Sequence, residues 1–118
     1  MKLKLVRQGE SLVHVECEGE IKAESVGTAT DPMQALLGPL VFSHTVVLDL
    51  EKATYIDSAG LGWLVISHKH FVENNGKLIL HSVSPQVYRV LEIVRLPLVL
   101  NIAADEAAAR AMATGGKR

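Results

Sequence analysis

The sequence predicts a single α/β domain with a mixed sheet, in which an N-terminal antiparallel hairpin joins a mainly parallel core. Three observations support this fold class. The chain has 118 residues, the size of one compact domain. Apolar and polar residues alternate along two segments near the N-terminus, whereas apolar runs and helical patterns alternate from residue 45 onward. We expect one domain over residues 1–118, with its core at about 3–113.

The N-terminal region has the pattern of two strands joined by a turn. Lys2 to Arg7 and Ser11 to Glu18 alternate in polarity, as strands with one solvent-exposed face do. The link between them, Gln8-Gly9-Glu10, is short, which predicts an antiparallel hairpin. Three later runs are almost continuously apolar and predict strands covered on both faces, at 45–50, 77–82 and 98–102.

Helical patterns separate these runs. Residues 58–74 form an amphipathic pattern that ends at Asn74-Asn75-Gly76, a typical helix stop. The predicted apolar face of this helix comprises Leu61, Leu64, Val65, His68, Phe71 and Val72. Ser84-Pro85 predicts a cap followed by proline at the first helical position, and Val87, Val90, Leu91 and Val94 recur at helical spacing.

Two shorter helices complete the prediction. Asp31-Pro32 opens a short helix over residues 31–37, which Gly38-Pro39 interrupts. Asp105 is expected to cap a final alanine-rich helix that ends before Gly115-Gly116.

Composition excludes several classes of protein. Hydrophobic residues make up 48% of the chain, which argues against disorder, and the net charge of −1 leaves no basic stripe for nucleic acid. The N-terminus lacks the apolar run of a signal peptide, and the longest uncharged stretch contains two prolines, so we expect no membrane insertion. A single cysteine, Cys17, allows no internal disulfide, so the cytoplasm is the expected location.

The residues also argue against catalysis. Gly60-x-Gly62 lacks the third glycine of a dinucleotide site, and the residue two positions before Ser58 is Ile56, not the glycine of a nucleophile elbow. No phosphate-binding loop precedes a helix, and the five histidines show no metal-ligand spacing. We therefore expect no catalytic residue, no metal and no cofactor.

The most unusual local sequence is residues 55–64, where a strand gives way to a helix. Two glycines within the first helical turns cost about 1 kcal/mol each relative to alanine, so something else must favour them. In one interpretation, Asp57 or Ser58 caps the helix, and Gly60 and Gly62 allow close packing on the sheet. In the other, this turn is a docking or modification surface that presents a hydroxyl group.

These residues resemble the STAS family, named for sulfate transporters and anti-sigma factor antagonists. The matching segments are Gly19-Glu20-Ile21, residues 46–50, residues 55–62, Asn75-Gly76-Lys77-Leu78 and Ser84-Pro85-x-Val87. The resemblance implies a mixed sheet with helices mainly on one face. It also implies that Ser58, the serine after the motif aspartate, is phosphorylated by an anti-sigma factor that is itself a serine kinase of the GHKL type. A separate phosphatase of the PP2C type is expected to reverse the modification.

The resemblance also implies a partner-binding surface. Its residues are Lys22, Asp57, Ser58, Ala59, Gly60, Leu61 and Gly62. Lys22 stands where such relatives commonly carry an acid, and Ala59 replaces the second serine that many of them have. The loop after the second strand is expected to bring Lys22 close to Ser58.

Two functions of different class remain open. The first is an anti-sigma factor antagonist, a partner-switching regulator that binds its kinase and is controlled by phosphorylation of Ser58. The second is a non-catalytic scaffold subunit of a transport or sensory complex without a phosphorylation cycle. The hydroxyl of Ser58 favours the first, since a scaffold has no need of it.

Overall fold

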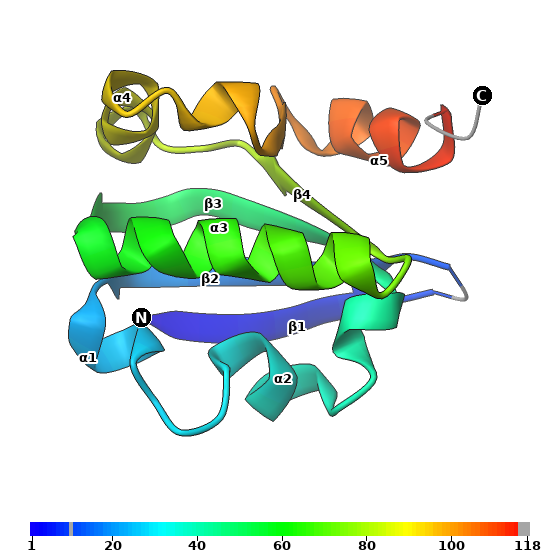
Figure 1. The fold of residues 1–118 in the computed structure, drawn as a ribbon. Coiled ribbons are helices and arrows are strands. Elements are labelled where there is room, and N and C mark those ends of the chain that lie inside the picture. The colour runs from blue at the N-terminus through cyan, green and yellow to red at the C-terminus, as the bar shows by residue number, and fades with distance from the viewer. Residues whose placement is uncertain (10, 116–118) are drawn as a thin grey trace.

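The computed structural model describes residues 1–9 and 11–115 and contains a five-stranded sheet in the order β1-β2-β3-β4-β5 (Figure 1). The strands are β1 (Lys2–Gln8), β2 (Val13–Ile21), β3 (Thr45–Ile56), β4 (Lys77–His81) and β5 (Asn101–Ala103). β1 pairs antiparallel with β2, and all the other neighbours are parallel. The predicted mixed sheet with an N-terminal hairpin is thereby confirmed.

Helices connect the strands. They are α1 (Ala23–Val26), α2 (Pro32–Leu37), α3 (Ser58–Glu73), α4 (Pro85–Ile93) and α5 (Glu106–Gly115), together with 3-10 turns at Val41–Ser43 and Leu96–Leu98. α1 was not predicted from the sequence, because four residues are too few to show a helical period. Within the described ranges, none of these helices combines the length and apolarity needed to cross a bilayer.

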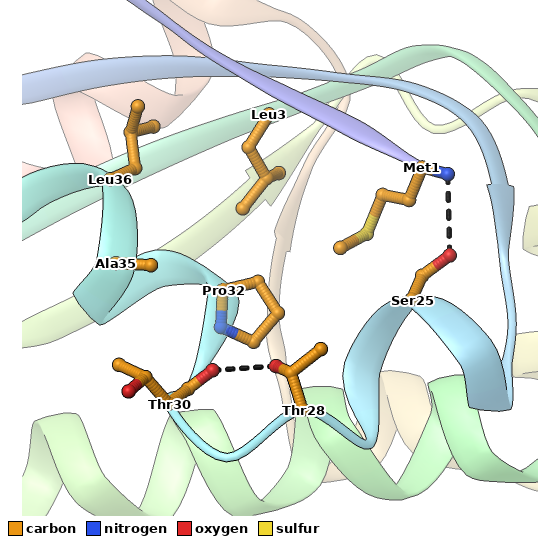
Figure 2. A pocket seen from close by; sticks show the side chains of 8 residues that line it. All are labelled: Met1, Leu3, Ser25, Thr28, Thr30, Pro32, Ala35 and Leu36. Carbon is orange, nitrogen blue, oxygen red and sulfur yellow. Dashed lines mark hydrogen bonds between the residues drawn. The ribbon is translucent and has the colours of Figure 1, made fainter.

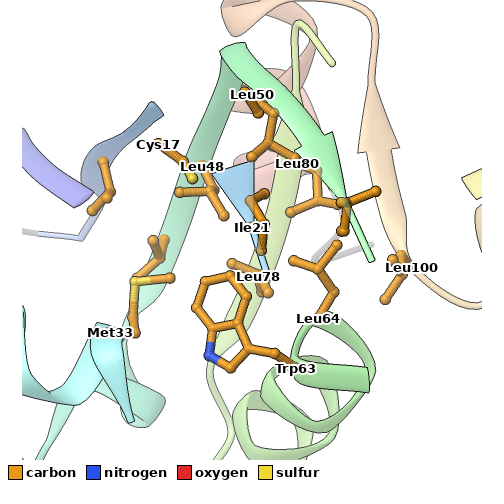
Figure 3. Close-up of a cluster of buried hydrophobic side chains, with 14 of the residues drawn as sticks. Cys17, Ile21, Met33, Leu48, Leu50, Trp63, Leu64, Leu78, Leu80 and Leu100 are labelled. Atoms are coloured by element: carbon orange, nitrogen blue, oxygen red, sulfur yellow. The ribbon is translucent and has the colours of Figure 1, made fainter. Parts of the chain in front are cut away.

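More helices pack against one face of the sheet than against the other. Val46, Leu48 and Leu50 of β3 turn to one face and join the main core together with residues of α2, α3 and α4 (Figure 3). Val47, between them, turns to the other face and packs with Ile79 in a small cluster that α5 covers. The helices therefore lie mainly on one face, as expected, and α5 is the exception.

Some predicted boundaries were wrong. β2 and β3 run on to Ile21 and Ile56, where the two residues pair in register, so both strands are longer than their sequence patterns. The run 98–102 is mostly not strand, because Arg95 adopts a left-handed conformation and Pro97 lies within a 3-10 turn. β5 begins only at Asn101, which pairs with Ile79. Leu98, predicted to be buried, is 84% exposed.

The buried face of α3 is rotated from the predicted one. Trp63 and Ser67 lie inside with Leu64 and Phe71, whereas Val72 is 59% exposed. Trp63 is drawn inward because its indole Nε1 donates to the carboxylate of Asp31 at 3.0 Å, a contact between segments far apart in sequence. A similar correction applies to α4. The helix ends at Ile93, which leaves Val94 exposed.

The Ser84 side chain was predicted to cap α4, but it makes no capping hydrogen bond. Its hydroxyl donates to the carbonyl of Ala53 at 2.6 Å, and its backbone N–H donates to the carbonyl of Leu50 at 3.2 Å. Proline does occupy the first position of α4, as predicted. Ser84 thus ties the start of α4 to β3, because a buried hydroxyl must find a partner.

The two motif glycines have different roles. A Cβ atom at Gly60 would lie 2.5 Å from the carbonyl oxygen of Ile21, so only glycine lets α3 approach the end of β2 this closely. A Cβ atom at Gly62 would meet nothing within 4 Å. The expectation that Gly62 allows close packing of the helix on the sheet was wrong.

This difference predicts opposite effects of alanine at the two positions. Gly60→Ala should lower the free energy of unfolding by about 1–3 kcal/mol, because a backbone carbonyl cannot move aside as a flexible side chain would. Gly62→Ala should leave it unchanged or raise it by up to about 1 kcal/mol through helix propensity. Urea unfolding of both variants measures this, and equal destabilisation would contradict the packing difference.

Candidate functional site

The candidate site lies where β2 and β3 end and α3 begins. The N–H of Asp57 donates to the carbonyl of Ile21 at 3.1 Å, which extends the pairing of the two strands by one bond. The chain then turns into α1 after β2 and into α3 after β3. The carboxyl ends of two parallel strands therefore bring the two turns together, in the region where sites in such sheets commonly form.

Asp57 is the residue that joins these turns. One carboxylate oxygen accepts the N–H of Gly60 at 2.9 Å and caps α3, and the other accepts the N–H of Ala23 at 3.2 Å at the start of α1. The bond from Gly60 lowers the pKa of Asp57, burial opposes the shift, and the bond from Ala23 adds to it. Of the two capping candidates, Asp57 is the cap.

Ser58 follows as the first residue of α3 and is exposed. Within residues 1–9 and 11–115, no hydrogen-bond partner is found for its hydroxyl. Since Asp57 already caps the helix, the hydroxyl of Ser58 has no structural task at this turn. It stands beside the positive end of the α3 dipole, where an added negative charge is tolerated.

Lys22 lies against the same turn through its backbone. Its neighbours in sequence, Ile21 and Ala23, both bond to Asp57, so the loop after β2 does reach the start of α3. The ammonium group of Lys22 bonds to the carboxylate of Glu20 at 2.8 Å. The hydrogen bond to Glu20 and the negative charge of Glu20 raise the pKa of Lys22. The same bond and the positive charge of Lys22 lower the pKa of Glu20. The positive charge beside the turn is therefore already paired.

A groove lies between α3 and the segment that follows α1. Its volume is about 360 Å³, and its lining comprises Val26, Gly27, Thr28, Asp31, Ala59, Gly62, Trp63 and Ile66. Ile66 is 54% exposed, and Gly62 contributes no side chain to fill the space. The wall formed by the segment after α1 was not predicted, because a groove between two non-neighbouring segments leaves no local pattern.

The predicted residues from 57 to 62 thus separate into those that hold the fold together and those that are exposed or line the groove. Asp57 and Gly60 build the turn, and Leu61 packs partly buried against the main core. Ser58 is exposed beside them. Ala59 and Gly62 line the groove.

Other features of the described residues add little chemistry. A pocket of about 510 Å³ lies between the start of β1 and the segment from α1 to α2 (Figure 2). Its lining contains no acidic or basic side chain, and the Thr28 hydroxyl donates to the carbonyl of Thr30 at 2.6 Å.

Across residues 1–9 and 11–115, no group of three or more histidine, cysteine or acidic side chains is placed to hold a metal ion. Burial raises the pKa of Cys17 to about 12, as for an inert core thiol.

The double role of Asp57 predicts a pH-dependent effect of Asp57→Asn. At pH 7 the variant should melt at a lower temperature, because the asparagine NH₂ group would face the N–H of Ala23, donor against donor. The pKa of Asp57 is lowered in the folded chain, so its contribution is complete above its ordinary value of 3.8 and is lost as the pH falls through the folded value. Melting curves at pH 7 and pH 3 should show the gap to wild type shrinking, and a constant gap would contradict this role.

Comparisons with known proteins agree with this geometry. The model of the STAS domain family matches residues 4–109. A STAS-domain containing protein of Pseudomonas aeruginosa (strain UCBPP-PA14) is 40% identical over 47 residues, which are 40% of this chain and 46% of that protein. The match thus spans less than half of that relative.

Solved structures share the fold over nearly the whole chain. The anti-sigma factor antagonist SpoIIAA in its unphosphorylated form has a TM-score of 0.71 at 21% identity and covers 97% of both chains. The phosphorylated form of the Bacillus protein has a TM-score of 0.64 at 19% identity and covers 94% of this chain and 99% of its own. An anti-sigma factor antagonist from Mycobacterium paratuberculosis has a TM-score of 0.74 at 17% identity, over 95% and 94%. Together with the family match, these similarities show that the chain belongs to the STAS domain family.

Proposed function

We propose that this STAS domain is an anti-sigma factor antagonist that works by partner switching. In its unmodified form it binds an anti-sigma factor that is also a serine kinase of the GHKL type, and phosphorylation of Ser58 ends the association. The observation that carries the proposal is the exposed serine at the first position of α3, relieved of capping by Asp57 and next to an unfilled groove. A PP2C-type phosphatase would restore the binding form.

The folded domain is suited to accept a phosphate at Ser58. Phosphorylation adds about −1.5 to −2 charges, and a helix N-terminus offsets a nearby negative charge by about 0.3–1 kcal/mol. The carboxylate of Asp57 repels the phosphate, and the ammonium of Lys22 is engaged by Glu20. These effects oppose one another, so the fold should change little in stability.

Binding is expected to respond far more strongly than folding. A partner surface shaped for a neutral hydroxyl would have to desolvate the phosphate, and an uncompensated buried charge costs several kcal/mol. A loss of about 3 kcal/mol weakens affinity more than a hundredfold. Phosphorylation of Ser58 therefore controls partner binding, while the stability of the folded domain changes little. The likeness to SpoIIAA, solved in both states, supports this assignment.

The proposal includes the other expectations drawn from the resemblance. The regulator would act in the cytoplasm, would bind its partners through Lys22 and the residues 57–62, and would have no turnover of its own. The competing function is a scaffold subunit of a transport or sensory complex, which would use the same groove but leave Ser58 unmodified. Phosphorylation in cells therefore separates the two.

The switch predicts distinct behaviour for two variants of Ser58. Ser58→Ala should bind the kinase constitutively, and Ser58→Asp should keep its melting temperature but lose affinity more than tenfold. The probe is each recombinant GHKL-type anti-sigma kinase from the source genome, titrated by calorimetry. Ser11→Asp, at an exposed serine that precedes β2, is the matched control and should bind as wild type does.

Mass spectrometry of the protein from cells completes this test. Phosphate on Ser58, removed in the Ser58→Ala strain, is the expected result. Unchanged affinity of Ser58→Asp, with Ser58 unmodified in cells under all growth conditions, would contradict the switch and favour the scaffold function.

The open groove predicts a separable binding defect. Gly62→Leu should fold normally, because its side chain enters free space, yet it should weaken kinase binding by filling the groove. Ala107→Leu, at an exposed position of α5, adds the same side chain elsewhere and should have no effect on binding. Calorimetry and melting curves check both variants. Full affinity in Gly62→Leu would show that the partner does not use the groove.

A further inference from the structure

The surface formed by the end of α4 and the 3-10 turn after it is strongly apolar. Four exposed aliphatic side chains gather there, and we call them the ridge: Ile93, Val94, Leu98 and Val99. Leu98 is 84% exposed and Ile93 is 73% exposed. Single exposed aliphatic residues are common on protein surfaces, but several that lie together indicate a docking surface.

The chain holds the ridge in a fixed conformation. Leu96, in the middle of the segment, packs against the main core, and Leu100, directly after it, is buried in that core. The N–H of Leu98 donates to the carbonyl of Arg95 at 3.3 Å. Arg95 itself has a φ of 62°, a left-handed conformation that costs a non-glycine residue energy. Because the backbone is already ordered, a partner that binds the ridge pays little to immobilise it.

An apolar pocket lies beside the ridge. Its volume is about 430 Å³, and its lining comprises Val83, Tyr88, Pro97, Ile102, Ala103 and Ala104. Pro97 directly precedes Leu98, so the projecting side chains and the pocket belong to one surface. A two-fold rotation places the projection of each copy against the pocket of the other. The surface is therefore complementary to a second copy of itself.

The charged side chains on the outer face of α4 have the same property. Arg89, Glu92 and Ile93 lie within about one helical turn and are all exposed. Arg89 and Glu92 make no ion pair within the part of the chain that the structure describes. When two α4 helices pack antiparallel about a two-fold axis, Arg89 of each copy can lie opposite Glu92 of the other. The same register sets Ile93 opposite Tyr88, which lines the pocket.

We propose that the ridge and the pocket form a two-fold dimer interface, in which α4 packs antiparallel to α4 of a second copy of this chain. The charges favour this occupant over a lipid surface. Anionic lipids attract clusters of lysine and arginine, whereas Glu92 stands here between Arg89 and Arg95. A surface that carries both signs of charge around an apolar centre matches its own copy.

The dimer interface is separate from the candidate site. Figure 1 shows α4 above the sheet and α1 below it, and the groove beside Ser58 lies between α3 and the segment after α1. Two copies joined through α4 would therefore leave both grooves open. The proposal does not rest on the function proposed for Ser58.

Sedimentation equilibrium of the full chain over a range of concentrations tests the interface. The wild type should form a dimer that dissociates on dilution, because the patch is of modest size. Leu98→Asp should keep its circular dichroism spectrum but weaken dimerisation more than about tenfold, since its carboxylate would lose water in an apolar contact. Leu40→Asp, at a 73% exposed leucine that follows α2, is the matched control and should dimerise as wild type does.

Exchange of charges tests the antiparallel register. Arg89→Glu sets acids opposite each other twice about the axis, and Glu92→Arg does the same with arginines, so each variant alone should dimerise weakly. An equimolar mixture of the two should form a heterodimer, because every acid then faces an arginine of the other variant. Glu73→Arg, at an exposed acid of α3, should dimerise as wild type does.

Three results would overturn the proposal. The first is a wild-type chain that stays monomeric up to millimolar concentration, and its binding to phosphatidylglycerol vesicles would then assign the ridge to a lipid surface. The second is equal dimerisation of Leu98→Asp and wild type. The third is a mixture of Arg89→Glu and Glu92→Arg that dimerises no better than either variant alone. None of these measurements involves Ser58 or a kinase, so their outcome is independent of the proposed function.

Discussion

The close approach of α3 to the end of β2 is the constraint on which the candidate site depends. It exists because Gly60 has no side chain where a Cβ atom would meet the carbonyl of Ile21. At that distance the Asp57 carboxylate reaches the N–H of Gly60 on one side and that of Ala23 on the other. One acidic side chain thereby satisfies backbone donors from two helices, and Ser58 is left to face solvent.

This arrangement separates the residues that build the turn from those proposed to meet a partner, within a few positions of the chain. Asp57 and Gly60 are engaged in the fold, whereas Ser58 and Gly62 make no contact that the fold requires. A change of charge or size at the second pair therefore alters the surface with little effect on the core. A regulator that must remain folded in two modification states needs such a division, because native domains are only marginally stable.

Sequence patterns sufficed for much of the fold and for the turn at the centre of the site. Apolar runs marked β3 and β4, and alternation marked the hairpin of β1 and β2. Asp57 before Ser58 and a pair of glycines identified the turn itself. Such features are local, since strand burial, capping and helix stops depend on neighbours within a few residues.

Only the tertiary structure decided which face and which partner each residue has. Trp63 turned inward because Asp31 accepts its indole N–H, and the Ser84 hydroxyl found the carbonyl of Ala53 rather than its own helix. The two motif glycines look alike in sequence, yet Gly62 faces an open groove. His14 meets Glu106 only because α5 folds back over the sheet. The sequence alone determined most of the elements and the serine at the turn. Contacts between distant segments determined orientation and pairing, because their energies depend on positions that no local pattern records.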